Sequence, residues 1–187
     1  MKRIIAVVSL CLFVFGFSGM VWSGEKAPQK VVDLANTSLA KLGLDPIVVK
    51  AVQEANAKGQ TLDQIKAMDA KWTDQAGIAD YMKALMDSEC GKYLGTIQKS
   101  APYYAEIFVM DNQGANVAMT DKTSDYWQGD EDKFQKSFNK GQGAVFVDEV
   151  EFDDSSQAYL VQISVPVMDA DKAVGAITFG IDIDKVQ

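Results

Sequence analysis

The stretch that decides the interpretation of this chain is Tyr104–Phe138, YAEIFVMDNQGANVAMTDKTSDYWQGDEDKFQKSF. It contains two short apolar runs, Glu106–Met110 and Ala115–Met119, joined by the four residues Asp111–Gly114. Aspartate at the start of such a connection and glycine at its end favour a type I turn. We therefore expect a tight antiparallel hairpin, with a positive φ at Gly114.

A polar loop follows the hairpin. The run Thr120–Asp125 consists of hydroxyl, carboxylate and lysine side chains, and the aromatic residues Tyr126 and Trp127 come directly after it. A helix is expected to begin near Asp130 and to carry two phenylalanines on one face, since they are one turn apart. Hydroxyls, carboxylates and large aromatic rings are thus concentrated in one loop.

The pattern from Asp111 to Glu131, D-x-x-G-x-x-V-A-x-T-x-x-T-S-D-Y-x-Q-x-D-E, resembles the Cache superfamily of extracytoplasmic, PAS-like sensor domains. The resemblance continues through Asp153–Ser156, Ile163–Val167 and Gly175–Ile183, and it covers residues 80–187. It implies an α+β fold in which N-terminal helices precede a PAS-like antiparallel sheet with a covering helix and loop. It also implies a ligand pocket at that loop.

Seven residues are the candidates for binding a small ligand in this pocket. Asp125 and Thr120 would orient polar groups of the ligand, and aromatic side chains would supply apolar walls. The alternative is that Trp127 and Phe134 are core residues and that Thr123–Asp125 only caps the next helix. The full candidate set is Thr120, Thr123, Asp125, Tyr126, Trp127, Phe134 and Tyr159.

The remaining elements are expected from periodicity and caps. Helical spacing of apolar residues runs from Ala27 to Gln98, with an N-cap at Asp45, a stop at Lys58-Gly59, a capping box at Thr61 and a last helix over Ile78–Ile97. These helices would cover one face of the sheet or extend as a stalk; a surface for a partner protein is the alternative. The expected later strands are Ala144–Val147, Val150–Phe152, Tyr159–Val165 and Val174–Ile183.

The first 23 residues have the pattern of a secretory signal peptide. Lys2-Arg3 precedes the apolar segment Ile4–Phe17, and Val21-Trp22-Ser23 forms a cleavage site before Gly24. We therefore expect three parts: a signal peptide at 1–23, a helical region at 24–100 and a Cache/PAS-like sensor domain at 101–187. The protein would be periplasmic, or membrane-anchored if the segment stays uncleaved.

Composition excludes several functions. Without residues 1–23 the chain has 16 basic and 26 acidic side chains, a net charge of −10, which disfavours nucleic-acid binding. The chain has no histidine, which removes Ser/His/Asp and Cys/His triads and His-bearing zinc sites. Cys90 alone remains after cleavage, so it cannot form an internal disulfide. The adjacent pair Asp153-Asp154 would point apart in a strand, and we expect no enzymatic activity and no cofactor.

The sequence therefore favours an exported small-molecule-binding sensory protein that acts with a membrane-bound receptor or as a homodimer. No signalling output module follows the last expected strand. The alternative is a divalent-cation-binding or protein-interaction module of the cell envelope. Its acidic runs are Asp130–Asp132 and Asp148–Asp154, but neither has the Asp-x-Asp-x-Asp-Gly order of a calcium loop.

Overall fold

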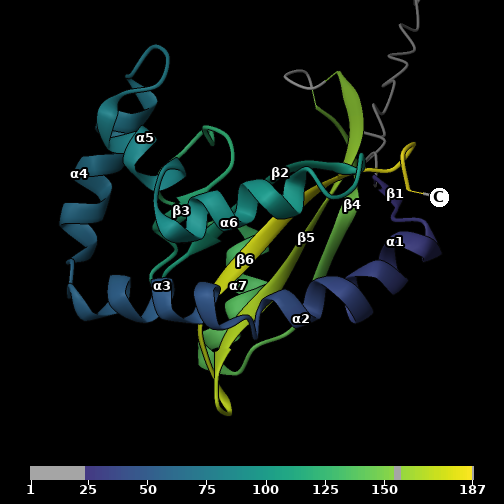
Figure 1. The fold of residues 1–187 in the computed structure, drawn as a ribbon, viewed down its shortest axis with the longest axis horizontal. Helices are drawn as coiled ribbons and strands as arrows, with labels where there is room; N and C mark the ends of the chain where they lie inside the picture. Colours follow the sequence, from purple (N-terminus) through teal and green to yellow (C-terminus); the bar gives the residue numbers. More distant parts are fainter. Residues whose placement is uncertain (1–23, 154–156, 187) are drawn as a thin grey trace, which may run out of the picture.

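The computed structural model describes residues 24–153 and 157–186, so the expected signal peptide lies outside the described residues. Within them, six antiparallel strands form one sheet in the order β1-β4-β5-β6-β2-β3 (Figure 1). This sheet, combined with separate helices, confirms the expected α+β class. The strands are β1 Glu25–Lys26, β2 Tyr104–Met110, β3 Asn116–Met119, β4 Phe146–Asp153, β5 Ala158–Asp169 and β6 Lys172–Asp182.

Most of the N-terminal half is helical, as expected. The side chain of Asp45 accepts a hydrogen bond from the Ile47 N–H at 2.9 Å, and Thr61 forms a capping box with Gln64. Both predicted helix starts are therefore confirmed. The helices are α1 Gln29–Leu34, the π-helical η1 Ala35–Leu39, α2 Ala40–Leu42, α3 Pro46–Ala57, α4 Leu62–Thr73, α5 Asp80–Met86, α6 Glu89–Gln98, α7 Asp132–Phe138 and the 3₁₀ turn η2 Asn139–Gly141.

Several expected boundaries were wrong. The single helix expected over Ile78–Ile97 is two helices, because Ser88 caps a new one by accepting a hydrogen bond from the Gly91 N–H at 2.9 Å. The two short strands expected at 144–152 are one strand, β4, interrupted by a shift of register between Val147 and Val150. Helix α7 begins at Asp132, two residues later than expected.

The hairpin at Asp111–Gly114 is confirmed. Gly114 has a φ of +86°, and its N–H donates to the Asp111 carbonyl at 3.2 Å. A Cβ at Gly114 would lie 2.5 Å from Cα of Gly129. Glycine is thus required both by the backbone conformation and by the close approach of the following loop.

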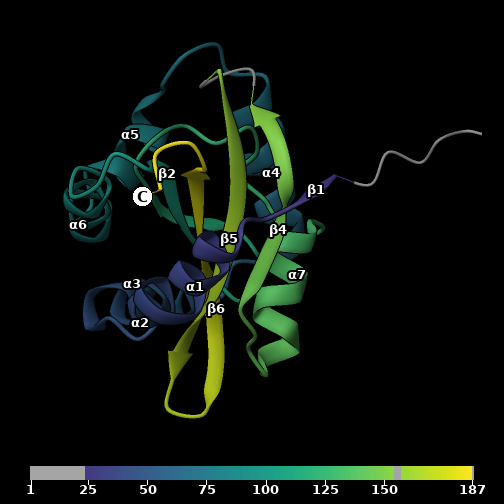
Figure 2. The same cartoon turned by 90° about the vertical axis from the view of Figure 1, so that its right-hand side faces the viewer.

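The sheet buries its two faces against different helices. Figure 2 shows α1, α2, α3 and α6 on one side of it and α7 on the other. The first side holds the larger core, in which odd-numbered strand residues such as Val109, Ile163 and Phe179 pack under Val31 and Leu94 of the helices. Helices α1, α2, α3 and α6 therefore cover one face of the sheet and share its core (Figure 2).

The second face is covered less completely. Phe108 and Met110 of β2 pack there with Trp72 of α4, Met82 of α5 and Phe134 of α7. Even-numbered residues of β2, β5 and β6 point to this side, since side chains alternate along a strand. No helix within residues 24–153 and 157–186 is both long enough and apolar enough to cross a bilayer.

Candidate functional site

Polar side chains gather on the second face of the sheet, in the part that α7 leaves open. The strand registers place Glu106 of β2 beside Gly180 of β6, and Gly180 beside Gln162 of β5. The next row across the same strands is Phe108, Thr178 and Ser164. Glu106, Gln162 and Phe108 of these two rows line the floor of a pocket of about 410 Å³.

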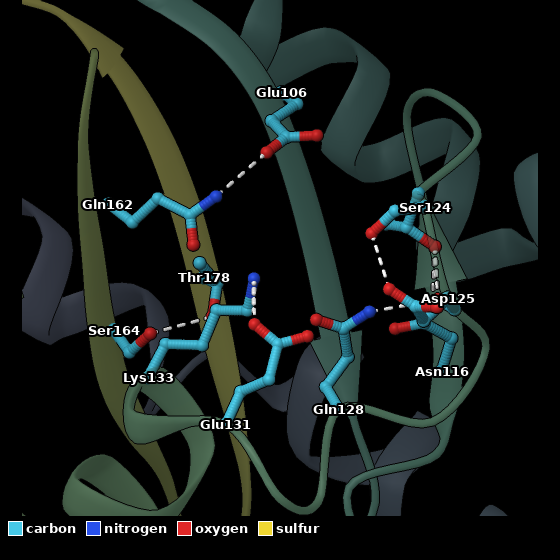
Figure 3. Close-up of polar contacts among 11 residues, drawn as sticks. Glu106, Asn116, Ser124, Asp125, Gln128, Glu131, Lys133, Gln162, Ser164 and Thr178 are labelled. Atoms are coloured by element: carbon cyan, nitrogen blue, oxygen red, sulfur yellow. Dashed lines mark hydrogen bonds and ion pairs between the residues drawn. The ribbon is translucent and has the colours of Figure 1, made fainter. Parts of the chain in front are cut away.

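Gly180 leaves space for the Glu106 side chain on this face. A Cβ at Gly180 would lie 2.8 Å from Cγ of Glu106, so a side chain here would displace the glutamate. Across the gap, Nε2 of Gln162 donates to the Glu106 carboxylate at 3.4 Å (Figure 3). In the row below, the hydroxyls of Ser164 and Thr178 are buried and 2.7 Å apart.

Helix α7 supplies one wall of the pocket. The ammonium of Lys133 lies 5.5 Å from the centre of the Phe108 ring and 2.8 Å from a carboxylate oxygen of Glu131. The Lys133 side chain is 12% exposed. Because it pairs with Glu131 and lies over an aromatic ring, this ammonium is held in place beside the pocket.

The carboxyl group of Glu106 has a displaced pKa. Burial raises its pKa above the usual value of 4.5, and the charge of Lys133 opposes that rise. The carboxylates of Asp153, Asp121 and Glu131 raise the pKa further. A carboxyl group with a displaced pKa in a hollow is a frequent mark of a functional site.

The opposite wall is the loop between β3 and α7, which is attached to α4 by four hydrogen bonds. A single carboxylate oxygen of Asp69 accepts from the N–H groups of Tyr126 and Trp127 at 2.8 and 3.0 Å. Nε1 of Trp72 donates to the Thr123 carbonyl at 2.8 Å. Lys122 donates to the Gln75 carbonyl at 2.7 Å, just beyond the end of α4. The loop is thus a fixed wall.

Gln128 joins this wall to the pocket. Its Nε2 donates to the Asp125 carbonyl at 2.8 Å, so its Oε1 must point the other way. Figure 3 shows that oxygen on the side of the sheet. The residue is 1% exposed and lines the pocket, yet Oε1 has no hydrogen-bond partner among the described residues.

The structure gives the predicted polar residues three different surroundings. Thr120 extends the hairpin, because its Oγ1 accepts from the Ile107 N–H at 2.9 Å. Thr123 is buried and lines the pocket, and its hydroxyl donates to the Asp125 carbonyl at 2.7 Å. The Asp125 carboxylate accepts from Ser124 at 2.6 Å and lines a separate surface hollow.

The predicted aromatic residues lie around the pocket or away from it. Tyr126 packs on Trp72 with ring centres 5.5 Å apart, and Phe134 is 6% exposed and stacks on Phe138 at 5.2 Å. Trp127 donates from Nε1 to the Gln113 carbonyl at 2.8 Å and lines the same surface hollow as Asp125. Tyr159 is 52% exposed and contacts Phe152, and strand alternation puts it on the face of the N-terminal helices.

Sequence reasoning missed Glu106, Gln128, Lys133, Gln162 and Gly180. A signal was present for two of them, since Glu106 and Gln162 are polar residues within the apolar runs YAEIFVM and YLVQISV. What the sequence did not reveal is the strand register that places them either side of a glycine.

An acidic hollow adjoins the pocket along β4. It shares Lys133, Gln162 and Asp153 with the pocket and adds Glu131, Glu149 and Glu151. No group of three or more acidic or cysteine side chains in the described parts of the chain is arranged to hold a metal ion. The charge around the pocket is nonetheless predominantly negative.

No protein-family model and no curated protein matches the sequence. Solved structures similar to this chain include the sensor domain of E. coli DcuS, with 15% identity and a TM-score of 0.49 over 85% of this chain and 96% of that domain. Another is the sensor domain of the V. cholerae histidine kinase DctB, with 15% identity and a TM-score of 0.40 over 84% and 55%.

The sensory domain of the C. jejuni chemoreceptor Tlp3 is also similar, with 15% identity and a TM-score of 0.43 over 85% of this chain and 64% of that one. The chain thus spans less than two thirds of the DctB and Tlp3 structures. All three are described as sensor or sensory domains. At these identities the similarity concerns the fold alone.

Proposed function

We propose that this protein is an exported small-molecule-binding sensory protein that acts with a partner in signal transduction. The observation that carries the proposal is the pocket between the Glu106–Gly180–Gln162 row, Lys133 and the β3–α7 loop. Its volume of about 410 Å³ suits a metabolite-sized ligand. The partner would be a membrane-bound receptor or a second copy of the chain.

The chemistry of the pocket supports binding without turnover. Its polar groups come from three strands, a helix and a loop, so a ligand would be contacted from several directions at once. Since the chain has no histidine, no imidazole is available to move a proton there, and the ammonium groups of Lys133 and Lys122 each bind a neighbouring oxygen. We assign the pocket a recognition role.

The site proposed here differs in part from the set expected from sequence. Thr123 remains as a lining residue, and Asp125 contributes by orienting Gln128 through its carbonyl. Tyr126, Trp127 and Thr120 would hold the loop in place, and Phe134 would support α7. Tyr159 lies too far along β5, on the other face, to contact a ligand in this pocket.

A thermal-shift screen tests the proposal. Small amines, amino acids, carboxylates and sugars are added to the wild-type protein, and compounds that raise its melting temperature are measured by calorimetry. Ser124→Phe places a ring at the exposed rim of the pocket and should abolish the shifts. Ser100→Phe, exposed at the end of α6, is the matched control and should retain them. Compounds that bind both variants equally would contradict the site.

A further inference from the structure

Two hydrogen-bond acceptors that line the pocket have unused capacity. Gln128 Oε1 is buried without a partner among the described residues, and the Glu106 carboxylate receives one long bond of 3.4 Å from Gln162. A carboxylate has room for about four hydrogen bonds. A buried acceptor left unsatisfied costs about 1–3 kcal/mol, so an orphaned amide oxygen in a lined hollow points to an absent donor.

Each donor group near the pocket already has one acceptor. Lys133 donates to Glu131 at 2.8 Å, and Lys122 donates to a backbone carbonyl at 2.7 Å. The Gln162 and Gln128 amide nitrogens donate to Glu106 and to the Asp125 carbonyl. A ligand therefore meets free acceptor capacity on both walls.

The charges around the pocket also favour a ligand that donates hydrogen bonds and is positively charged. The pocket adjoins the acidic hollow that contains Glu131, Glu149 and Glu151, and Asp153 lines both. The carboxylates outnumber Lys122 and Lys133 around the two cavities. A cation gains from this field, whereas an anion is repelled by it.

From these observations we infer that the ligand is a small primary amine, whose ammonium group binds the Glu106 carboxylate and which offers a second N–H or O–H donor to Oε1 of Gln128. The inference rests on the function proposed above and specifies the class of its ligand. Gly180 has a steric role in it, because the absence of a side chain there leaves the space in which the Glu106 side chain lies.

A skeleton-matched series tests the inference by calorimetry with the whole mature chain. For carbon chains of two to six atoms, the diamine, the amino alcohol, the diol, the amino acid and the dicarboxylate are compared at millimolar concentration. We expect the diamines and amino alcohols of one chain length to bind at least tenfold more tightly than the corresponding diol, about 1.4 kcal/mol or more. The dicarboxylates should not bind.

Two variants locate the contacts. Glu106→Gln keeps the shape of the side chain and removes its charge, and it should weaken amine binding at least tenfold. Glu54→Gln, an exposed residue of α3 on the opposite side of the sheet, makes the same change in net charge and should leave affinity unchanged. Gln128→Met removes the amide oxygen and should weaken the diamine and amino alcohol. If that variant does not fold, as judged by circular dichroism, Glu106→Gln alone decides.

The outcomes separate the two proposals. Binding of diols or dicarboxylates without binding of amines would overturn the inference and leave the pocket as a ligand site. Equal amine affinity for the wild type and Glu106→Gln would also overturn it. If no compound of this series or of the broader screen binds, both the inference and the proposed function are overturned.

Discussion

At the scale of single residues, Glu106 is expected to lower the stability of the fold, and it is the residue that we propose to bind the ligand. Its carboxyl group is placed among apolar strand residues, and burial raises its pKa above the usual 4.5. A group held in an unfavourable environment is expected to lower stability at neutral pH, when it is charged. Binding residues often show this exchange of stability for function.

Glu106→Gln should therefore raise the melting temperature at neutral pH. Because the pKa of Glu106 is higher in the folded state, its favourable contribution is present below the unfolded-state pKa and is lost as pH rises through the folded-state pKa. The advantage of the variant should shrink as pH falls from neutral through the folded-state pKa towards 4.5, and it should change little below 4.5. Each 1 kcal/mol corresponds to about 2–4 °C for a domain of this size.

Melting curves of both proteins over a pH series give the measurement. Lys133 of α7, Asp121 of the loop, Asp153 of β4 and Glu131 all face the same carboxyl group, so each contributes to the profile. A Gln variant that melts below the wild type at neutral pH would show that the charge of Glu106 is stabilising, contrary to this account.

Gly114→Ala should cost about 1–3 kcal/mol. The methyl group would meet the backbone of Gly129 at 2.5 Å, and the φ of +86° is unfavourable for alanine. Gly95→Ala is the control, since a Cβ there meets nothing within 4 Å and lies within α6. The control should gain about 0.5–1 kcal/mol. The free energy of unfolding of both variants is measured in urea. If Gly114→Ala and Gly95→Ala change this free energy by the same amount, the turn assignment at Gly114 is wrong.

At the scale of elements, α4 is the support of the β3–α7 loop. Asp69 binds two backbone N–H groups of that loop, and Trp72 binds the carbonyl of Thr123. Helix α4 follows α3 in sequence and lies more than 40 residues before the loop. The wall of the pocket is thus built by a contact between distant parts of the chain.

Asp69→Ala should loosen this wall. Two part-buried N–H groups would lose their acceptor, at a cost of up to about 1–3 kcal/mol each. We expect faster hydrogen exchange at the amides of Tyr126 and Trp127 and weaker ligand binding. Asp74→Ala, exposed at the C-cap of the same helix, should change neither. Unaltered exchange in the Asp69 variant would mean that the loop holds its shape without α4.

The elements also show how far the sequence could be interpreted. The hairpin turn, the Asp45 and Thr61 caps and the antiparallel α+β arrangement follow from local patterns, and all are present. The break at Ser88 was missed because a serine within an apolar helical pattern does not show whether its hydroxyl will cap. The pocket floor was missed because it depends on pairing between residues 106, 162 and 180, which no local pattern encodes.

At the scale of the whole molecule, the N-terminal segment is part of the sheet. Glu25 and Lys26 of β1 pair with Val150 and Glu149 of β4. The expected cleavage after Ser23 would leave this strand intact at the start of the mature chain. The helical region then crosses one face of the sheet before the hairpin begins, so both regions contribute to a single core.

Expressed with its own leader, the protein should accumulate in the periplasm with Gly24 as its first residue. The basic start and the apolar run before Val21-Trp22-Ser23 are the reason. Intact mass and N-terminal sequencing of the periplasmic fraction would check this. Recovery of the chain with Met1 in the membrane fraction would instead favour an anchored sensor.

The most direct test of the central claim is amide chemical-shift mapping by NMR with the tightest-binding compound of the screen. The account predicts that the shift changes centre on Glu106, Gln128, Gln162 and Gly180, on the face of the sheet beside α7. Changes centred instead on the hollow between α3 and α6, around Lys50 and Ala84, would place the ligand on the opposite face and contradict the account.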